Sequence, residues 1–181
     1  MSEKTGLPVR KDIRWKGYDY KTPANYFITI VIHDRLCLLG DVIGDEVVLS
    51  EAGQMVHQKI EELTTRFAES EIPFFVVMPN HIHLILQNLG SHHLGDMMRW
   101  FKSVTTNNYI HGVKEKGWKP FRNTLWQTRF YDHVIRNQRA YDYIANYILQ
   151  NPSRWSQDKL NDACNESPDD INAVIKTLEP Y

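Results

Sequence analysis

Cysteines are scarce in this sequence, and no apolar run is long enough to span a membrane. The chain holds two cysteines, Cys37 and Cys164, which lie far apart and form no CxxC pair. Their scarcity excludes a disulfide framework and a cysteine-rich zinc module, and it favours a reducing cytosol. A membrane span needs roughly 20 apolar residues, and the N-terminus also lacks the apolar segment of a signal peptide. We therefore expect a cytoplasmic protein with no membrane partner.

The sequence has almost no excess of positive or negative charge, because its formal net charge is -1. The average hides blocks: residues 1–24 hold six Lys/Arg against three Asp/Glu, and residues 94–155 hold ten against four. The remaining residues, 25–93 and 156–181, are acidic. Segment 94–155 is also rich in Trp, Tyr and Phe, and basic residues interleaved with aromatic ones suit single-stranded nucleic acid. Solvated surface faces give similar blocks, so both interpretations stay open.

Hydrophobic patterning predicts one unit of alternating strands and helices, without internal repeats or low-complexity tracts. Ser50 is typical of a helix N-cap, and Pro152 ends the last predicted helix of this unit. The order of elements favours an α+β sandwich of ferredoxin-like type, with helices packed on an antiparallel sheet. The expected strands cover 25–32, 73–78, 81–87 and 125–135, a hairpin covers 36–49, and the helices cover 50–70, 94–111 and 138–151.

His81 and His83 lie two positions apart in the predicted strand 81–87. Because side chains alternate along a strand, both imidazoles leave one face, while Ile82 and Leu84 leave the other. Two imidazoles on one face suit a single divalent ion. Histidines that are exposed or hydrogen-bonded on a strand would produce the same spacing, so the pair alone does not establish a metal site.

On the predicted helix 138–151, Tyr143, Tyr147 and Asn151 recur at intervals of four residues and share one face. The pattern is compatible with a tyrosine stripe packed on the sheet, which we favour for Tyr143. For Tyr147 it also allows a phenol nucleophile, with the Asn151 carbonyl oxygen as a metal ligand one turn later.

These segments resemble the single-tyrosine HUH transposases, and among them the REP-associated tyrosine transposases. PNHIHLIL resembles their His-hydrophobic-His motif, and NYILQNPSRW resembles their nucleophile helix. The likeness extends over about residues 10–161, through RKDIRWKGYDY, YFITI, FKSVTT and LWQTRFYDHVIRN in the family's order. It implies a single transposase domain over 1–161, with a basic arm at 1–24 and an acidic tail at 162–181.

The resemblance implies that His81 and His83 bind Mg²⁺ or Mn²⁺ and that Tyr147 attacks DNA. Asn151 falls where the family has its third metal ligand, often Gln, and Gln150 is the alternative. The implied activity is cleavage and rejoining of single-stranded DNA at hairpins through a 5′-phosphotyrosine, by a monomer or a homodimer. The basic residues that we expect to contact phosphates are Arg14, Lys16, Lys102, Arg129, Arg136 and Arg154.

Other functions fit parts of the pattern. A histidine-triad hydrolase needs a third histidine where Ile85 stands. A non-catalytic module that binds single-stranded nucleic acid would need only the basic and aromatic segment, and a structural partner protein would not bind nucleic acid. The tail segment INAVIKTLE is expected to dock as a helix through Ile171, Val174, Ile175 and Leu178, or to compete with DNA for the basic segment.

Overall fold

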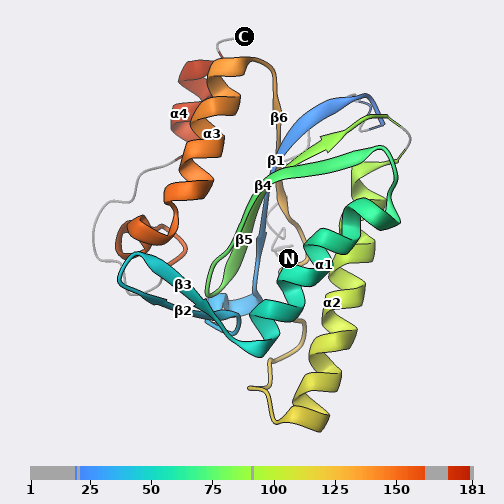
Figure 1. The fold of residues 1–181 in the computed structure, drawn as a ribbon, viewed down its shortest axis with the longest axis vertical. Helices are drawn as coiled ribbons and strands as arrows, with labels where there is room; N and C mark the ends of the chain where they lie inside the picture. Colours follow the sequence, from blue (N-terminus) through green and yellow to red (C-terminus); the bar gives the residue numbers. More distant parts are fainter. Residues whose placement is uncertain (1–18, 20, 91, 162–170, 180–181) are drawn as a thin grey trace, which may run out of the picture.

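The computed structural model describes residues 19, 21–90, 92–161 and 171–179, in which helices cover both faces of one antiparallel sheet (Figure 1). A separate two-stranded hairpin, residues 40–49, lies beside the short helix Pro152–Gln157 (Figure 1). No helix in these residues combines the length and the apolar character of a membrane span. The elements are β1 (Ala24–Val31), η1 (His33–Arg35), β2 (Gly40–Ile43), β3 (Glu46–Leu49), α1 (Glu51–Arg66), β4 (Ser70–Val77), β5 (His81–Asn88), α2 (Leu94–Lys116), β6 (Tyr131–Ile135), α3 (Gln138–Gln150), η2 (Pro152–Gln157) and α4 (Ile171–Leu178).

The main sheet has the strand order β4-β5-β1-β6, and each neighbouring pair is antiparallel. Helix α1 connects β1 with β4 by way of the β2–β3 hairpin, and α2 connects β5 with β6. Strands β4 and β5 form the predicted antiparallel hairpin around Pro79 and Asn80. The predicted α+β sandwich of ferredoxin-like type is therefore confirmed, with β5 and β1 at its centre.

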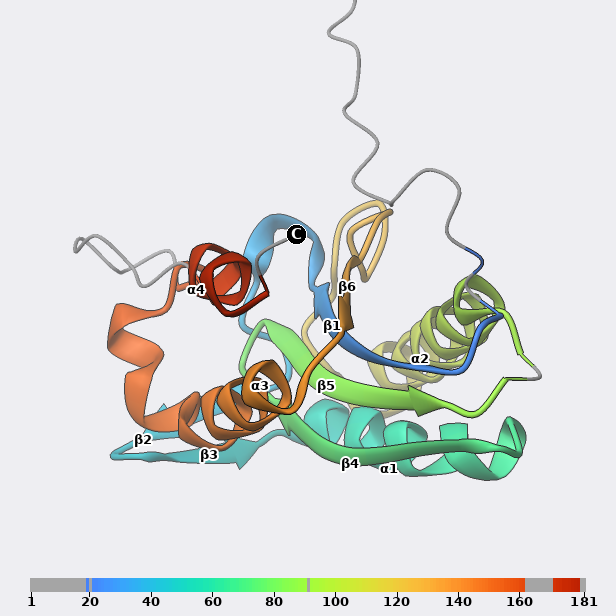
Figure 2. The ribbon, with the colours of Figure 1, turned by 90° about the horizontal axis from the view of Figure 1, so that it is seen from above.

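The two faces of the sheet carry separate hydrophobic cores. Seen from above, α3 and α4 lie on one side of the sheet, and α1 and α2 lie on the other (Figure 2). Ile28 of β1 and Leu84 of β5 belong to the core under α1 and α2. Phe27 and Ile85 belong to the opposite core, under α3 and α4. Because His81 and His83 share the parity of Ile85, they lie on the α3 side of the sheet.

The start of α1 matches the predicted cap, because Ser50 Oγ accepts a hydrogen bond from the backbone N–H of Gly53 at 3.1 Å. A Cβ at Gly53 would lie 1.9 Å from the Leu39 carbonyl oxygen, so this turn of the helix requires glycine. The helix ends at Arg66, earlier than the predicted residue 70, because Ser70 already begins β4.

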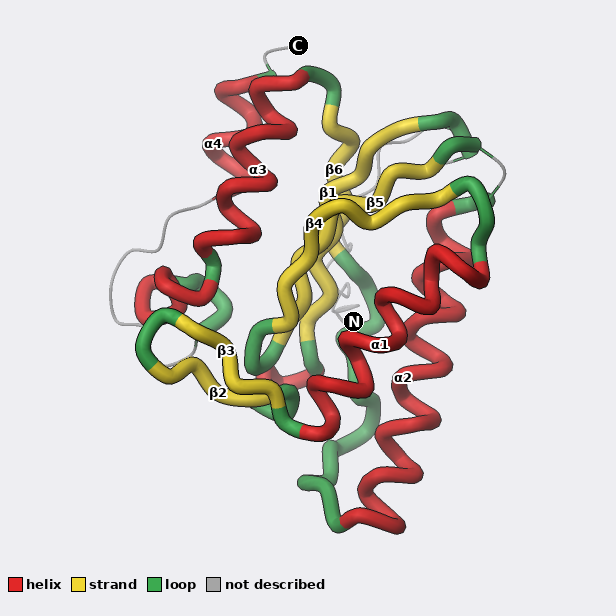
Figure 3. The backbone as a smooth tube through the Cα atoms, viewed as in Figure 1, coloured by secondary structure: helices red, strands yellow, loops and turns green. Residues whose placement is uncertain are grey.

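The strand predicted over 125–135 is correct only from Tyr131, and residues 117–130 run as a loop between α2 and β6 (Figure 3). Leu125 and Trp126 are buried in the α2 core, where Trp126 Nε1 donates to Thr105 Oγ1 at 2.8 Å. Their apolar character therefore serves packing, and only one isolated bridge joins Trp126 to Ile32. Helix α2 continues past the predicted residue 111 and stops where Gly117 adopts a left-handed φ of 69°.

Candidate active site

Helix α3 lies on the sheet face that carries the two histidines, and its last turns bring Tyr147 to His83. His81 is 0% exposed and His83 is 3% exposed. The Tyr147 Oη atom lies 3.4 Å from His83 Nε2, and the two rings meet edge to face at 5.2 Å between centroids. The helix is amphipathic, and the side chains of Ile144 and Ile148, near Tyr147 on the helix, are buried against the sheet. This packing determines the rotation that turns Tyr147 toward β5.

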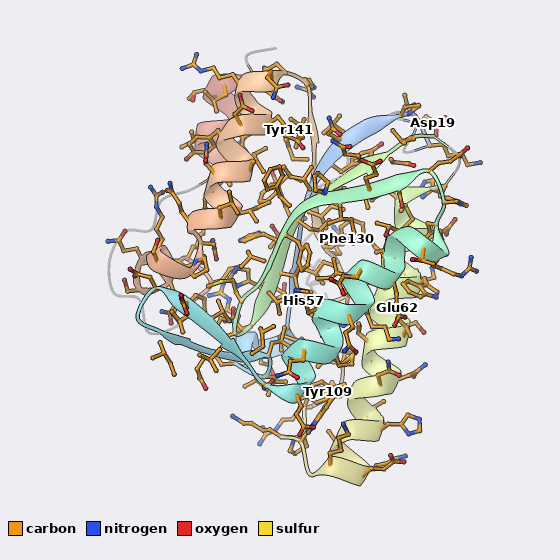
Figure 4. All side chains as sticks on the ribbon, in the orientation of Figure 1. Asp19, His57, Glu62, Tyr109, Phe130 and Tyr141 are labelled. Carbon is orange, nitrogen blue, oxygen red and sulfur yellow. The ribbon has the colours of Figure 1, made fainter. Side chains whose placement is uncertain are left out.

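The remaining aromatic residues of α3 contribute to packing, as predicted for Tyr143. Tyr143 is half-buried against the core of this face. Tyr141, labelled in Figure 4, contacts Phe74 of β4 with 6.2 Å between ring centroids. Neither of these tyrosines lines the cavity at His83, whereas Tyr147 does.

Hydrogen bonds orient both imidazoles. His83 Nδ1 lies 2.8 Å from Thr29 Oγ1, on the neighbouring strand β1. His81 Nδ1 lies 2.8 Å from Asn80 Oδ1. In each ring the Nδ1 atom is therefore occupied, and Nε2 is the atom that faces the space under α3. In histidines that bind metals, the ring nitrogen that does not contact the metal typically makes a hydrogen bond of this kind.

Asn151 and Asp158 complete the polar cluster. Asn151 is 1% exposed, and its Nδ2 donates to Asp158 Oδ2 at 3.3 Å. The same carboxylate oxygen lies 3.9 Å from His81 Nε2. One ligand atom each from His81, His83 and Asp158 lie within 4.8 Å of one another. Gln150, the alternative to Asn151, is exposed to solvent and does not line the cavity.

Two buried atoms of this cluster have no hydrogen-bond partner among the described residues: His81 Nε2 and Asn151 Oδ1. Leaving a buried polar atom unpaired costs about 1–3 kcal/mol, so such pairs of atoms indicate a missing binding partner. Both atoms are lone-pair donors, and nitrogen and oxygen donors of this kind suit Mg²⁺, Mn²⁺ or a similar divalent ion. The donor set therefore fits the metal that the resemblance implied.

The protonation states support the same conclusion. Burial lowers the pKa of His81 to about 3, and the contact with Asn151 opposes this only partly. Burial and the neighbouring His81 also lower the pKa of His83, although Asp158 acts in the opposite direction. Burial raises the pKa of the Tyr147 phenol, and the Asp158 carboxylate raises it further. At neutral pH both histidines are thus neutral, as metal ligands must be, and the phenol keeps its proton.

A cavity of about 240 Å³ opens in front of these groups. His83, Tyr147, Asn151 and Asp158 line it, and Thr29 and Val31 form its wall on β1. The cationic residues Arg154 and Lys159 also line it and are exposed to solvent. A phosphate group entering this cavity would meet positive charge at the entrance and the phenol inside.

The other residues expected to contact phosphates have different surroundings. Arg14 and Lys16 lie outside the described residues. Lys102 is half-buried and donates to the carbonyl oxygens of residues 127, 128 and 129, at 2.8 to 3.4 Å, so it holds the loop before β6. Arg136 approaches Glu179 at 3.9 Å. Arg129 and Arg154 are exposed, and among the described members of the set Arg154 alone lines the cavity.

Sequence reasoning missed three residues of the site: Thr29, Asn80 and Asp158. The pairing of β1 with β5 brings the Thr29 side chain to His83, and a turn brings the Asn80 side chain to His81. Neither arrangement leaves a periodic pattern in the sequence. Asp158 lies in the segment 156–181, which its composition describes only as acidic. The alternation that placed His83 could have suggested a polar partner on β1, but the register of the two strands is needed to identify Thr29.

Comparisons with known proteins identify the family. A family model described as "Transposase IS200 like" matches residues 41–151. An uncharacterized protein of Haemophilus influenzae is 32% identical over 177 residues, covering 86% of this chain and 94% of that protein. The REP-associated tyrosine transposase of Escherichia coli is 27% identical over 133 residues, covering 74% of this chain and 68% of that protein.

A solved structure is also similar: a REP-associated tyrosine transposase bound to a REP hairpin. It superimposes with a TM-score of 0.58 at 25% identity, and the match covers 78% of this chain and 73% of that one. The sheet, the matched family segment and the sequence relatives lead to one conclusion. The chain belongs to the IS200-like transposase family and has REP-associated tyrosine transposases among its relatives.

Proposed function

We propose that this protein is a metal-dependent transposase that cleaves and rejoins single-stranded DNA through a 5′-phosphotyrosine on Tyr147. One observation carries the proposal. The Tyr147 phenol lies 3.4 Å from His83 Nε2, in a cluster with two buried donor atoms, on His81 and Asn151, that lack partners among the described residues. A nucleophile beside an incomplete set of metal ligands is what phosphoryl transfer with a covalent intermediate needs.

His81, His83 and Asn151 would hold the divalent ion, and Asp158 is a fourth candidate ligand. When bound, Mg²⁺ or Mn²⁺ would neutralise charge on the scissile phosphate and favour the ionised phenol. Asp158 offers a carboxylate oxygen, the ligand type that hard cations prefer. This oxygen lies 3.9 Å from His81 Nε2, so it is close enough to join the same set of ligands.

The chain's own residues account for the positions of the reacting groups. Tyr147 Oη forms a bond to phosphorus, and the bond from phosphorus to the 3′ oxygen breaks. The phenol releases its proton to water, and the leaving oxygen takes up a proton and becomes a 3′-OH. Because the phosphotyrosine conserves the phosphodiester energy, a second 3′-OH can attack it, release the phenol and rejoin the strand without ATP.

We infer that the substrate is a hairpin with single-stranded flanks. The support is the similar transposase that is bound to a REP hairpin, together with the cations Arg154 and Lys159 at the cavity. The competing proposal, a binding module without catalysis, would use the same surface but would leave the unpartnered atoms of His81 and Asn151 without a purpose.

Covalent capture distinguishes the two functions. The full chain is incubated with Mn²⁺ and a hairpin oligonucleotide that carries a label at its 3′ end, and the products are separated under denaturing conditions. Because the 5′ phosphate stays on tyrosine, an enzyme gives a labelled protein band that disappears in excess EDTA. Binding in a native gel without any covalent band, with Mn²⁺ or Mg²⁺ present, would establish the binding module instead.

Replacement of Asp158 tests its inclusion among the ligands. Asp158→Asn keeps the size of the side chain and removes the charge, so we expect Mn²⁺ affinity to fall by about tenfold or more. Glu71→Gln, on the exposed edge of β4, is the matched loss of one acidic charge and should leave the affinity unchanged.

A further inference from the structure

Asn80 is a buried polar residue that the proposed chemistry does not use. It lies in the turn between β4 and β5, directly before His81, and is 1% exposed. The sequence pattern indicates only a turn at Pro79 and Asn80. A turn position that is exposed to solvent tolerates many polar residues. In a fully buried side chain, by contrast, each polar group needs a hydrogen-bond partner within the protein.

The contacts of Asn80 determine the orientation of its amide. Its Nδ2 donates to the backbone carbonyl of Arg35 at 3.1 Å and to the backbone carbonyl of Leu160 at 2.8 Å. Both amide hydrogens are therefore used. A flipped amide would place Oδ1 against two carbonyl oxygens, which cannot donate, so Oδ1 must face His81.

This orientation determines the tautomer of His81. Asn80 Oδ1 can only accept, so the His81 Nδ1 atom 2.8 Å away must carry the hydrogen. In the neutral ring Nε2 then holds a lone pair. That atom is buried, has no partner in the part of the chain that the structure describes, and faces the acceptor Asp158 Oδ2 at 3.9 Å. Two acceptors facing each other in a buried site are compatible when a cation lies between them.

Asn80 also holds the segment that carries Asp158. Leu160 receives the Asn80 hydrogen bond at its carbonyl, and its N–H donates to Asp158 Oδ1 at 2.7 Å. One side chain thus contacts a histidine of the site and the loop that brings in the carboxylate. These contacts span distant parts of the chain, since 80 residues separate Asn80 from Leu160.

We propose that Asn80 is a positioning residue that holds His81 as the Nδ1–H tautomer and keeps the Asp158–Leu160 segment against the metal site. The proposal rests on the proposed function in one respect, the use of His81 Nε2 as a metal ligand. The tautomer itself is a property of the metal-free chain and can be measured without any activity.

The first test is nuclear magnetic resonance of the full chain with ¹⁵N-labelled histidine, in EDTA at neutral pH. We expect the His81 ring to show a hydrogen on Nδ1 and a bare Nε2. Asn80→Ala should lose this preference, because no acceptor then faces Nδ1. A wild-type His81 with its hydrogen on Nε2 would overturn the proposal.

Asn88 provides the matched control at the other end of β5. It is also 1% exposed, its Nδ2 donates to the His92 carbonyl at 2.8 Å, and its Oδ1 accepts from the Gly90 N–H at 3.2 Å. Asn88→Ala therefore removes a comparable buried amide without touching an imidazole. It should lower stability and leave the His81 tautomer unchanged.

The second test is titration with Mn²⁺ alone, followed by electron paramagnetic resonance. Asn80→Ala should bind Mn²⁺ about tenfold more weakly or worse, while Asn88→Ala should bind like the wild type. Unchanged tautomer and unchanged affinity in Asn80→Ala would contradict the proposal, and so would equal losses in both alanine variants. If wild-type His81 shows the expected tautomer but binds no Mn²⁺, the metal-dependent function fails and the tautomer assignment stands.

Discussion

Tyr147 and His83 meet with 3.4 Å between Oη and Nε2, although 64 residues separate them in the chain. Phe27 of β1 lies against both rings, stacked on His83 with 5.3 Å between centroids and edge-on to Tyr147 at 6.2 Å. Their relative position therefore depends on the packing of α3 on the sheet and not on the hydroxyl itself. Removing the hydroxyl should leave the geometry of the site intact.

Tyr147→Phe is expected to abolish the covalent DNA adduct and strand cleavage, because only the attacking oxygen is lost. Hairpin affinity should change by less than about twofold, since the ring still packs on Phe27. Denaturing gels measure the adduct, and native gels measure binding. Tyr143→Phe is the control and should retain the adduct; an adduct that survives in Tyr147→Phe would show that another residue is the nucleophile.

Asn151→Ala is expected to lower Mn²⁺ affinity by about tenfold or more and to lower cleavage with it. Its Oδ1 is one of the two buried atoms without a partner, whereas the adjacent Gln150 is exposed. Gln150→Ala should therefore bind Mn²⁺ like the wild type. Isothermal titration with Mn²⁺ measures both, and the reverse order of effects would make Gln150 the ligand.

Arg154→Ala is expected to weaken binding to a hairpin with single-stranded flanks and to reduce the salt dependence of that binding. One lost phosphate contact on a single strand changes the log-log salt slope by about 0.7. Lys102→Ala serves as the comparison, because this residue donates to carbonyls in the loop 127–129. It should lower thermal stability with a nearly unchanged salt slope, and a slope that changes only in Lys102→Ala would refute the assignment.

The metal-free protein is expected to lose stability as pH falls below about 6.5, the ordinary pKa of histidine. Burial lowers the pKa of His81 to about 3 and lowers that of His83, so the unfolded chain binds more protons in this window. The free energy of unfolding should then decrease by up to about 1.4 kcal/mol per pH unit for each histidine.

Urea unfolding in EDTA at a series of pH values measures this slope. His81→Leu removes one of the two groups and should reduce the slope, whereas His111→Gln, which is 70% exposed, should not. A free energy of unfolding that stays constant from pH 7 to pH 5 would show that the buried histidines are not neutral in the folded state.

A chain that ends at Asn161 is expected to be less stable but still able to cleave DNA below its melting temperature. Ile171 and Ile175 of α4 are 8% and 1% exposed, and Glu179 accepts from the Arg136 N–H at 2.6 Å and contacts His133 Nε2 at 2.9 Å. Burying two isoleucines contributes about 3 kcal/mol or more, so Tm should fall by roughly 10 °C.

Calorimetry measures the loss of stability, and the covalent assay measures cleavage. Lys176→Ala, at an exposed position of α4, should leave both unchanged. Tighter DNA binding by the shortened chain at low salt would show instead that the tail competes with DNA. Loss of cleavage by a folded shortened chain would show that the tail, whose Ile171 lines the cavity, is needed for the active site.

The two-residue spacing of His81 and His83 and the four-residue spacing of Tyr147 and Asn151 could be recognised in the sequence. They follow from the periods of a strand and a helix. The same local rules predicted the Ser50 cap and the β4–β5 hairpin. They failed for residues 125–130, where Leu125 and Trp126 are apolar because they pack under α2 and not because they pair with a strand.

The remaining parts of the site depend on contacts between distant segments. Whether Asn151 or Gln150 faces the histidines depends on how α3 rotates against the sheet, which Ile144 and Ile148 determine by burial. A turn brings Asn80 to His81, a loop brings Asp158 to the same ring, and the register of β1 with β5 brings Thr29 to His83. None of these features has a periodic signature in the sequence. Periodicity along the chain thus placed one candidate nucleophile and three candidate ligands on matching faces, while packing across the chain orients them and adds Asp158, because hydrogen bonds between distant segments form only once the sheet and α3 are assembled.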